Sequence, residues 1–157
     1  MLKIRIIVID RTRSPFLREG ESSYLKRLRK YVKVEWIEVK PAPIKKGRTE
    51  EEILLEEGQA IARRVEPRDY QVALDRSGDQ FDSEGLAGWL EDLSTKVPGW
   101  VSFLIGGPLG LSTPLLEGAD KVLSLSRLTL THEMSRLVLL EQLYRAFTIM
   151  KGEKYHR

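Results

Sequence analysis

Strand-like and helix-like hydrophobic patterns alternate along this chain from one end to the other. Residues 2–9 begin with apolar residues at every second position and end in an unbroken apolar run, which is typical of a strand becoming buried on both faces. Further strand patterns follow at 32–39, 70–75, 100–105 and 122–125, and helical patterns separate them at 16–31, 49–65, 83–96, from 113 onward and at 131–150. This alternation predicts an α/β fold in which helices cover both faces of a mostly parallel sheet.

The length and composition of the chain narrow the class of protein further. At about 100–200 residues per domain, 157 residues predict one domain spanning 1–157. The absence of cysteine excludes disulfides, thiolate zinc sites and a cysteine nucleophile. No apolar stretch is continuous enough to span a membrane. The N-terminus does not resemble a signal peptide, because Lys3 and Arg5 interrupt its apolar residues instead of preceding an unbroken apolar run. We therefore expect a soluble, cytoplasmic protein.

Charge is unevenly distributed, although the formal net charge is only +3. Residues 1–50 carry 14 Lys or Arg and 6 Asp or Glu, residues 51–100 carry 5 and 12, and residues 101–157 carry 7 and 5. A basic N-terminal third favours a polyanionic partner, although a solvated basic face gives the same pattern.

Several residues mark where elements begin or end. Thr49 followed by Glu52 is a capping-box pattern, Thr113 precedes a short helix that begins at Pro114, and Thr131 precedes the last helix. The turn residues at 77–78 predict the end of the third strand at Asp75.

The last predicted helix is apolar on two sides. One set consists of Leu137, Leu140, Tyr144 and Phe147, and the other of Val138, Leu139, Leu143 and Ile149. A helix of this kind needs more than one packing partner, which predicts a dimer interface. The alternative is a central helix buried within its own monomer.

Ligands of parallel α/β sheets bind beyond the carboxyl ends of the strands, where 74–78, 105–110 and 125–130 are expected to lie. The segment 105–110 contains Gly106, Gly107 and Gly110, so a flat ligand could approach its bare backbone. We expect a β-branched residue at Gly106 to fill that space. A P-loop lysine and the G-x-G-x-x-G spacing are absent, which disfavours phosphate binding, and a purely structural turn is an equal alternative.

We expect different roles for the two histidines. His132 falls in the first turn of the last helix, where a positive charge opposes the dipole, so we expect it to be neutral. His156 stands between Tyr155 and Arg157, and these residue types stack on bases and bind phosphates in RNA. The alternatives are a structural histidine and a frayed terminus. No carboxylate stands at ligand spacing and no nucleophile–base pair emerges, so we expect neither a metal site nor covalent hydrolytic catalysis.

Three segments in order resemble one known family. They are VSFLIGGPLGLS at 101–112, SLSRLTLTHEMSRLVLLEQLYRAF at 124–147, and the terminal Tyr-His-Arg at 155–157. Together they resemble the RlmH family of SPOUT-class RNA methyltransferases, and the resemblance extends over essentially the whole chain. It implies a homodimeric α/β protein whose C-terminal part forms a trefoil knot, a topology that periodicity does not reveal.

The reaction that the resemblance implies is methyl transfer from S-adenosyl-L-methionine to N3 of a pseudouridine in the 23S rRNA of the large ribosomal subunit. The residues that match the cofactor site are Leu74, Gly106, Gly107, Leu125, Ser126, Arg127, Leu128, Thr129 and Leu130. The resemblance assigns catalysis to Tyr155, His156 and Arg157, and contacts with the RNA to Arg145 and His132, with the terminal residues acting across the dimer.

The residues alone leave two other functions open, a non-catalytic RNA-binding module and a nucleotide-binding module. If the protein acts on RNA, the basic N-terminal third and the terminal Tyr-His-Arg should lie together as one positive rim, away from the acidic middle third.

Overall fold

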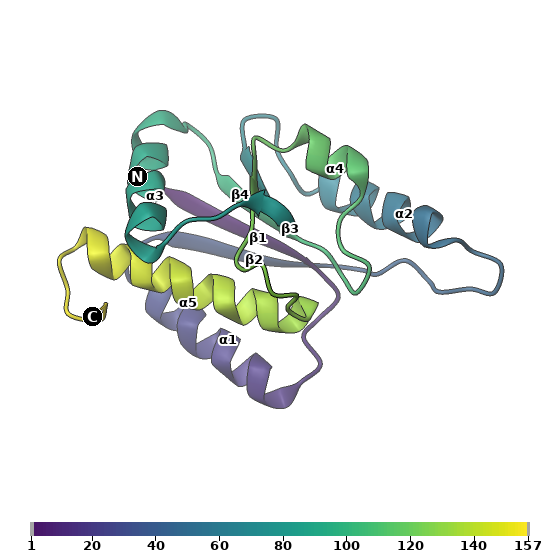
Figure 1. Ribbon diagram of the computed structural model, residues 1–157, viewed down its shortest axis with the longest axis horizontal. Helices are drawn as coiled ribbons and strands as arrows, with labels where there is room; N and C mark the ends of the chain where they lie inside the picture. Colours follow the sequence, from purple (N-terminus) through teal and green to yellow (C-terminus); the bar gives the residue numbers. More distant parts are fainter. Residues whose placement is uncertain (1, 157) are drawn as a thin grey trace.

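A computed structural model of the chain describes residues 2–156, and a parallel sheet forms its centre (Figure 1). Its strands are β1 (Lys3–Ile9), β2 (Lys33–Val39), β3 (Tyr70–Asp79), β4 (Val101–Ile105) and β5 (Lys121–Leu123). They lie in the order β2-β1-β4-β3-β5, and every neighbouring pair is parallel. The sheet confirms the α/β architecture that the alternating patterns predict.

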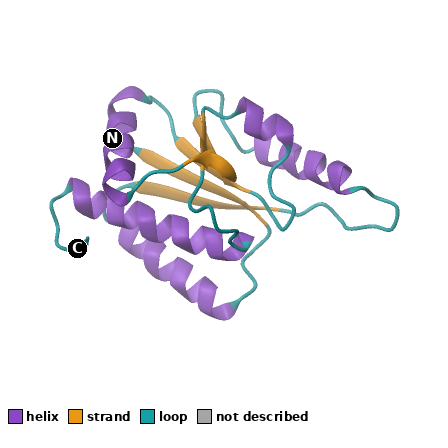
Figure 2. Cartoon of the chain, viewed as in Figure 1, coloured by secondary structure: helices purple, strands orange, loops and turns teal. Residues whose placement is uncertain are grey.

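Helices cover both faces of the sheet (Figure 2). They are α1 (Pro15–Leu28), α2 (Glu50–Ala62), α3 (Ser83–Lys96), α4 (Thr113–Gly118) and α5 (His132–Met150). Ile6 and Phe103 belong to a core with residues of α1, α3 and α5, whereas Ile7 and Leu104 belong to a second core with residues of α2 and α4. Neighbouring strand residues thus enter different cores, because alternate side chains point to opposite faces.

Capping hydrogen bonds confirm two predicted helix starts. The Oγ1 of Thr49 accepts the N–H of Glu52 over 3.1 Å, and the Oγ1 of Thr131 accepts the N–H of Met134 over 3.1 Å. The third predicted helix start, that of α4, is one residue too late. Ser112, rather than Thr113, is the N-cap of α4, and it makes no side-chain capping bond.

The prediction that β3 ends at Asp75 is wrong. The strand continues to Asp79 through Ser77 and Gly78, with an irregularity in the pairing: Leu74 and Asp79 both pair with Leu123 of β5. A Cβ on Gly78 would lie 2.5 Å from the carbonyl oxygen of Val122, so this glycine serves the close approach of two strands rather than a turn. β5 itself covers residues 121–123 instead of 122–125.

α5 lies in the middle of its layer and contacts both α1 and α3 (Figure 1). None of its residues from His132 to Met150 is fully exposed. The second packing partner that its two apolar sides require is therefore in the same chain, which is the alternative that the sequence left open. The homodimer stays a prediction. Within residues 2–156, no helix is long and apolar enough to cross a membrane.

Candidate functional site

A cavity of about 620 Å³ opens at the carboxyl ends of β3, β4 and β5. Ligands of parallel α/β sheets bind at this edge, and the volume is in the range of small-molecule sites. The wall consists of residues 74–76 of β3, residues 105–110 after β4, and parts of the segment from the end of β5 to the first turn of α5. From this last segment come Leu123, Leu125, Ser126, Leu128, Thr129, Leu130, Thr131, His132 and Ser135.

The glycine loop turns back on itself beside the cavity. The N–H of Gly110 donates to the carbonyl oxygen of Gly107 over 3.0 Å, and Gly110 has a φ of +84°, which glycine adopts at low cost. A Cβ on Gly106 would collide with the carbonyl group of Gly110. The expectation that a side chain at Gly106 fills the ligand space is therefore wrong, because that side chain would push apart the loop's own backbone.

Side-chain hydrogen bonds shape the rest of the wall. The Nη1 of Arg76 donates to the Oγ1 of Thr129 over 2.8 Å, which links β3 to the segment before α5. The Oγ of Ser126 accepts the N–H of Leu128 over 2.9 Å, and the Oγ of Ser124 donates to the carbonyl oxygen of Ser126 over 3.0 Å. These bonds hold an irregular segment in one conformation.

The structure brings most of the expected cofactor residues together in this cavity. Eight of the nine line it, namely Leu74, Gly106, Gly107, Leu125, Ser126, Leu128, Thr129 and Leu130. Arg127 is exposed and does not line it, whereas His132, expected to contact the RNA, lies in the wall. Sequence reasoning missed Leu123, Thr131 and Ser135 as wall residues, and it left Asp75 and Arg76 without a role although they stand in a segment expected at this edge.

The wall offers binding groups rather than a nucleophile. Burial and then the nearby charge of Arg136 lower the pKa of His132, so its imidazole is neutral at pH 7 as predicted, chiefly through burial. The hydroxyl of Ser135 donates to the carbonyl oxygen of Thr131 over 3.0 Å instead of pairing with the histidine. Among residues 2–156, no group of three or more His, Asp or Glu side chains could hold a metal ion.

Tyr155 and His156 form a second cluster, near the other end of α5. The Nη1 of Arg145 lies 3.1 Å from the Nδ1 of His156, and the guanidinium carbon lies 4.8 Å from the centre of the Tyr155 ring. Glu141 accepts from the Nε of Arg145 over 3.1 Å and from the hydroxyl of Tyr155 over 3.2 Å. Sequence reasoning missed Glu141, since no motif marks a lone glutamate on a helix. Arg157 lies outside the described residues.

α1 and the turn that follows it form the other side of this cluster. The hydroxyl of Tyr24 lies 3.2 Å from that of Tyr155, and the hydroxyl of Tyr31 donates to Glu153 over 2.6 Å. Burial and the contact with Tyr24 raise the pKa of Tyr155, and the bond to Glu153 raises the pKa of Tyr31 to about 12, so both phenols stay protonated. The exposed basic residues of α1 are Arg18, Lys26 and Arg27. The fold therefore places part of the basic N-terminal third beside the C-terminal residues.

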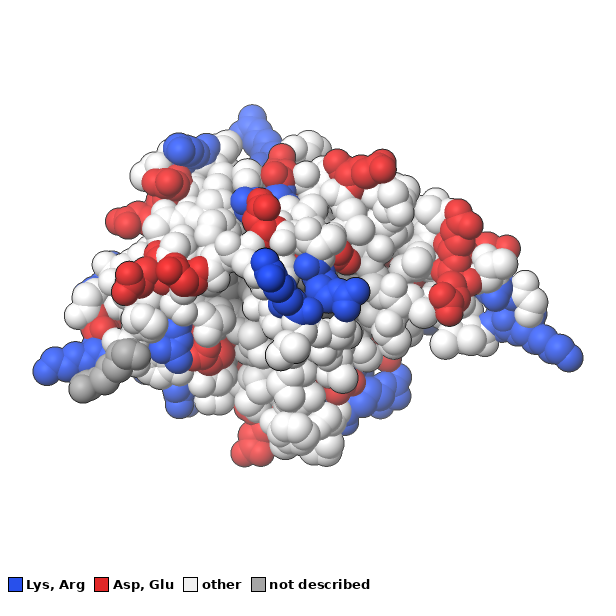
Figure 3. All heavy atoms as spheres, in the orientation of Figure 1, with Lys and Arg blue, Asp and Glu red and all other residues white. Residues whose placement is uncertain are grey.

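Acidic and basic side chains are interspersed over much of the face in Figure 3, with Asp and Glu also at the left and Lys and Arg also at the far right, but each sign is concentrated in one place. In Figure 3, Lys and Arg side chains gather near the middle of the face shown, over the strand ends and the segment that leads into α5. Asp and Glu side chains gather at the right, over α2. On this face, the acidic surface of α2 is thus separate from the basic surface over the carboxyl edge of the sheet.

The cavity and the Tyr155 cluster lie near opposite ends of α5. His132 is the first residue of the helix and Arg145 follows it by 13 residues, which corresponds to about 20 Å along the axis at 1.5 Å per residue. Figure 1 shows the C-terminus beyond the end of α5 that is remote from its first turn. Within one chain, the structure does not bring Tyr155 and His156 to the cavity.

A parallel sheet with a glycine-loop cavity at its carboxyl edge is the architecture of α/β proteins that bind small molecules beyond their strand ends. The sequence profile described as "Predicted SPOUT methyltransferase" matches residues 2–156. The chain therefore belongs to the SPOUT methyltransferase family.

Relatives match along their full length. The chain is 46% identical over 164 residues to Ribosomal RNA large subunit methyltransferase H of Moorella thermoacetica, with 100% of both chains covered. It is 40% identical over 159 residues to the protein of the same name from Halothermothrix orenii, with 99% of this chain and 100% of that one covered. A solved structure of a probable methyltransferase from Bordetella pertussis Tohama I matches with a TM-score of 0.58 and 13% identity, over 93% of this chain and 95% of that one. This last likeness shows a shared fold.

Proposed function

We propose that this protein transfers a methyl group from S-adenosyl-L-methionine to the RNA of the large ribosomal subunit, in the cytoplasm. One observation carries the proposal: the glycine-loop cavity lies in a chain that matches two large-subunit rRNA methyltransferases along their whole length. The finer assignment, to N3 of a pseudouridine, follows the resemblance to the RlmH family. The trefoil knot that this resemblance implies stays a prediction.

The donor groups of the cavity suit S-adenosyl-L-methionine better than a nucleoside triphosphate. Among residues 2–156, Arg76 is the one Lys or Arg that lines the wall, and its Nη1 already donates to Thr129. No lysine lines the cavity, whereas a P-loop needs one for the phosphates. Asp75 would attract a positively charged ligand, while the backbone of 106–110 and side chains such as Leu125 would hold its polar and apolar parts.

The residues near the C-terminus have the groups needed to bind the RNA base that accepts the methyl group. When bound, S-adenosyl-L-methionine supplies a methyl group already activated on a positively charged sulfur, so catalysis depends mainly on alignment. Because an arginine only donates, the Nδ1 of His156 accepts from Arg145 and the imidazole proton is on Nε2. That N–H could donate to a carbonyl oxygen of the base, where negative charge collects as N3 gives its proton to solvent water. The protonated phenol of Tyr155 would position the base rather than take the proton.

The separation of about 20 Å along α5 supports a homodimer. A C-terminal cluster that far from the cavity of its own chain could act only on a methyl group held elsewhere. We therefore propose that Tyr155, His156 and Arg157 of one copy complete the cavity of the other.

Calorimetry with S-adenosyl-L-methionine, ATP and GTP tests the proposed cofactor. We expect saturable binding of S-adenosyl-L-methionine and no binding of either nucleotide. Binding of ATP or GTP alone would indicate a nucleotide-binding module. Binding of ribosomal RNA without any of the three ligands would indicate a non-catalytic RNA-binding module.

A further inference from the structure

The loop between β1 and α1 presents an unusual set of exposed side chains. Arg11 is exposed, 63% of the Arg13 side chain is exposed, and Phe16, in the first turn of α1, is 68% exposed. An exposed aromatic ring beside two arginines offers a stacking surface together with positive charge, which favours an anionic partner with flat bases. None of these residues has a role in the proposed site.

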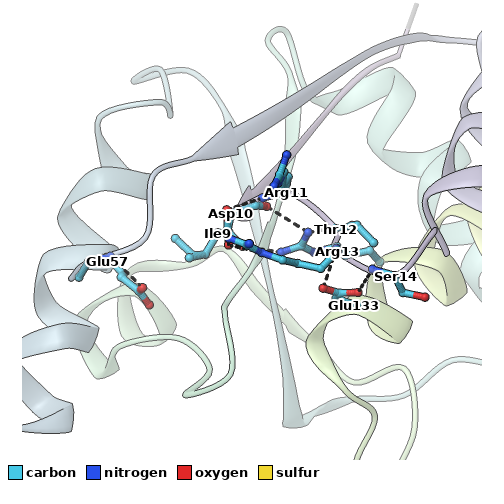
Figure 4. Close-up of polar contacts among 10 residues, drawn as sticks. Ile9, Asp10, Arg11, Thr12, Arg13, Ser14, Glu57 and Glu133 are labelled. Atoms are coloured by element: carbon cyan, nitrogen blue, oxygen red, sulfur yellow. Dashed lines mark hydrogen bonds and ion pairs between the residues drawn. The ribbon is translucent and has the colours of Figure 1, made fainter. Parts of the chain in front are cut away.

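This loop is held rigidly from beneath by α5. Arg136 is fully buried, and its guanidinium donates to the carbonyl oxygens of Ile9 (2.5 Å) and Asp10 (3.1 Å) and to the Oγ1 of Thr12 (2.9 Å). Glu133 accepts the N–H groups of residues 13 and 14, over 2.9 and 3.1 Å. Figure 4 shows Glu133 beneath these two residues.

Asp10 fixes both the backbone and one arginine of the loop. It has a φ of +67°, a conformation that is uncommon for a residue other than glycine and that persists where surrounding contacts impose it. Its Oδ2 accepts from the Nη2 and Nε of Arg13 over 2.8 and 3.2 Å (Figure 4). Arg13 is thereby held in one orientation, and its Nη1 is left for another acceptor.

The rigid loop stands next to the cavity. Ile9, where β1 ends, would lie 3.4 Å from a Cβ on Gly107 of the cavity wall. On the other side, Glu133 and Arg136 belong to the same turns of α5 as the wall residues His132 and Ser135. The loop and the cavity wall therefore share neighbouring residues at the end of β1 and in the first turns of α5.

The acidic groups that face the loop already have hydrogen-bonding partners. The carboxylate of Asp10 is bound to Arg13, and that of Glu133 is bound to backbone N–H groups, which also keep its pKa below the usual range despite burial. Glu21, on the buried side, accepts from Thr12 and lies beneath the loop rather than on its surface.

We propose that residues 10–16 form an RNA-binding loop, in which Arg11 and Arg13 bind phosphates and Phe16 stacks on an unpaired base. The proposal rests on the proposed function, because it takes the partner to be the RNA substrate. Arginine and exposed aromatic residues are the groups that bind single-stranded and loop RNA. A loop that is already ordered loses little conformational entropy on binding, so less of the binding free energy of its contacts is offset.

Binding to purified large ribosomal subunits, taken from cells that lack this protein, tests the loop directly. We expect Arg13→Gln and Phe16→Ala each to weaken binding about tenfold. The matched controls are Arg63→Gln and Leu55→Ala. Arg63 is an exposed cation at the C-terminal end of α2, and Leu55 is a partly exposed apolar residue within that helix. Both control variants should bind the subunits like the unchanged protein. Calorimetry with S-adenosyl-L-methionine and thermal unfolding should not distinguish the two pairs of variants.

The salt dependence of binding separates a phosphate contact from a structural role. Arg13→Gln should make the slope of log affinity against log salt shallower by about one, whereas Phe16→Ala should leave the slope unchanged. Phe16→Trp should retain binding, because it keeps a stacking surface. Unchanged subunit binding in both Arg13→Gln and Phe16→Ala would overturn the proposal, as would a change of oligomeric state in Phe16→Ala, which would assign this surface to a second copy.

The same measurements separate this inference from the proposed function. If the unchanged protein binds the subunits through Arg13 and Phe16 but transfers no methyl group, the RNA-binding loop stands and the proposed activity fails. If the protein methylates the subunits and both variants bind them normally, the activity stands and the loop proposal fails.

Discussion

Arg145 donates a hydrogen bond from Nη1 to the Nδ1 of His156 over 3.1 Å, at the end of α5 that is remote from the cavity. This contact orders the C-terminal residues against their own chain and fixes the imidazole proton on Nε2. It also keeps His156 away from the cavity of the same chain. In the proposed function, binding of the cofactor and contact with the RNA base are therefore assigned to two different parts of the chain.

Deleting residues 155–157 should therefore separate binding from catalysis. We expect the rate of RNA methylation to fall by about a hundredfold or more, since hydrogen-bond donors to the developing charge are lost. The affinity for S-adenosyl-L-methionine should not change. The measurements are a methyl-transfer assay on large ribosomal subunits and calorimetry. Full activity of the truncated protein would refute the assignment of Tyr155 and His156.

Mixing two inactive variants tests whether these residues act across a dimer. One partner lacks residues 155–157, and the other carries Gly106→Val in an otherwise complete chain. A hybrid dimer would combine the intact cavity of the first with the intact C-terminus of the second, so we expect co-expression of the two to restore methylation. Isolated hybrids without activity would show that the C-terminal residues do not complete the partner's cavity.

Gly106→Val should damage the cavity by distorting the glycine loop. A side chain at this position collides with the carbonyl group of Gly110, and overpacking of this kind costs about 1–3 kcal/mol of stability. Urea unfolding and calorimetry should show lower stability and loss of cofactor binding. Gly88→Ala is the matched control, because a Cβ there meets nothing within 4 Å, and it should stabilise the helix by about 0.5–1 kcal/mol. Wild-type stability and binding in Gly106→Val would contradict this account.

Arg136 and Glu21 should be coupled in stability. Arg136→Met removes three hydrogen bonds to the loop after β1 and leaves Glu21, 7% exposed, without a nearby cation. Removing one partner of a buried charged network costs about 3–5 kcal/mol. Adding Glu21→Gln to Arg136→Met should recover part of the loss, as measured by a double-mutant cycle in urea. Strictly additive effects would show that the two side chains do not interact.

Glu57 should make stability depend on pH. The side chain is 7% exposed and its Oε2 accepts the N–H of Ala42 over 3.1 Å, but burial raises its pKa. The folded protein thus binds this proton more tightly than the unfolded chain. This difference adds to the free energy of unfolding. The added stability is fully present below about pH 4.3, the ordinary pKa of glutamate, and is lost as the pH rises through the folded-state pKa.

Glu57→Gln should remove that loss, because a neutral amide can still accept from Ala42. Its free energy of unfolding should exceed that of the unchanged protein at pH 8, with a smaller difference at pH 4. Exposed Glu91→Gln serves as the control and should show no such trend. A variant that is less stable than the wild type at pH 8 would indicate that Glu57 is ionised and stabilising.

The sequence predicted the parallel α/β sheet and the edge at which the cavity lies, because strand and helix periods are local properties of the chain. Predictions from local patterns were wrong or incomplete where contact with a distant segment determines the structure. Ser77 and Gly78 resemble a turn, but they lie within β3, between Leu74 and Asp79, which both pair with Leu123 of β5, more than 40 residues later. The position of Tyr155 depends on a contact with Tyr24, 131 residues away, that no periodicity contains.

Mapping modified nucleotides in the large-subunit rRNA of cells with and without this protein tests the central claim most directly. We predict that one methylated pseudouridine disappears without the protein. It should return when the wild-type chain is supplied and stay absent when the chain carries Gly106→Val. Identical methylation of the rRNA in both kinds of cell would contradict the proposed activity.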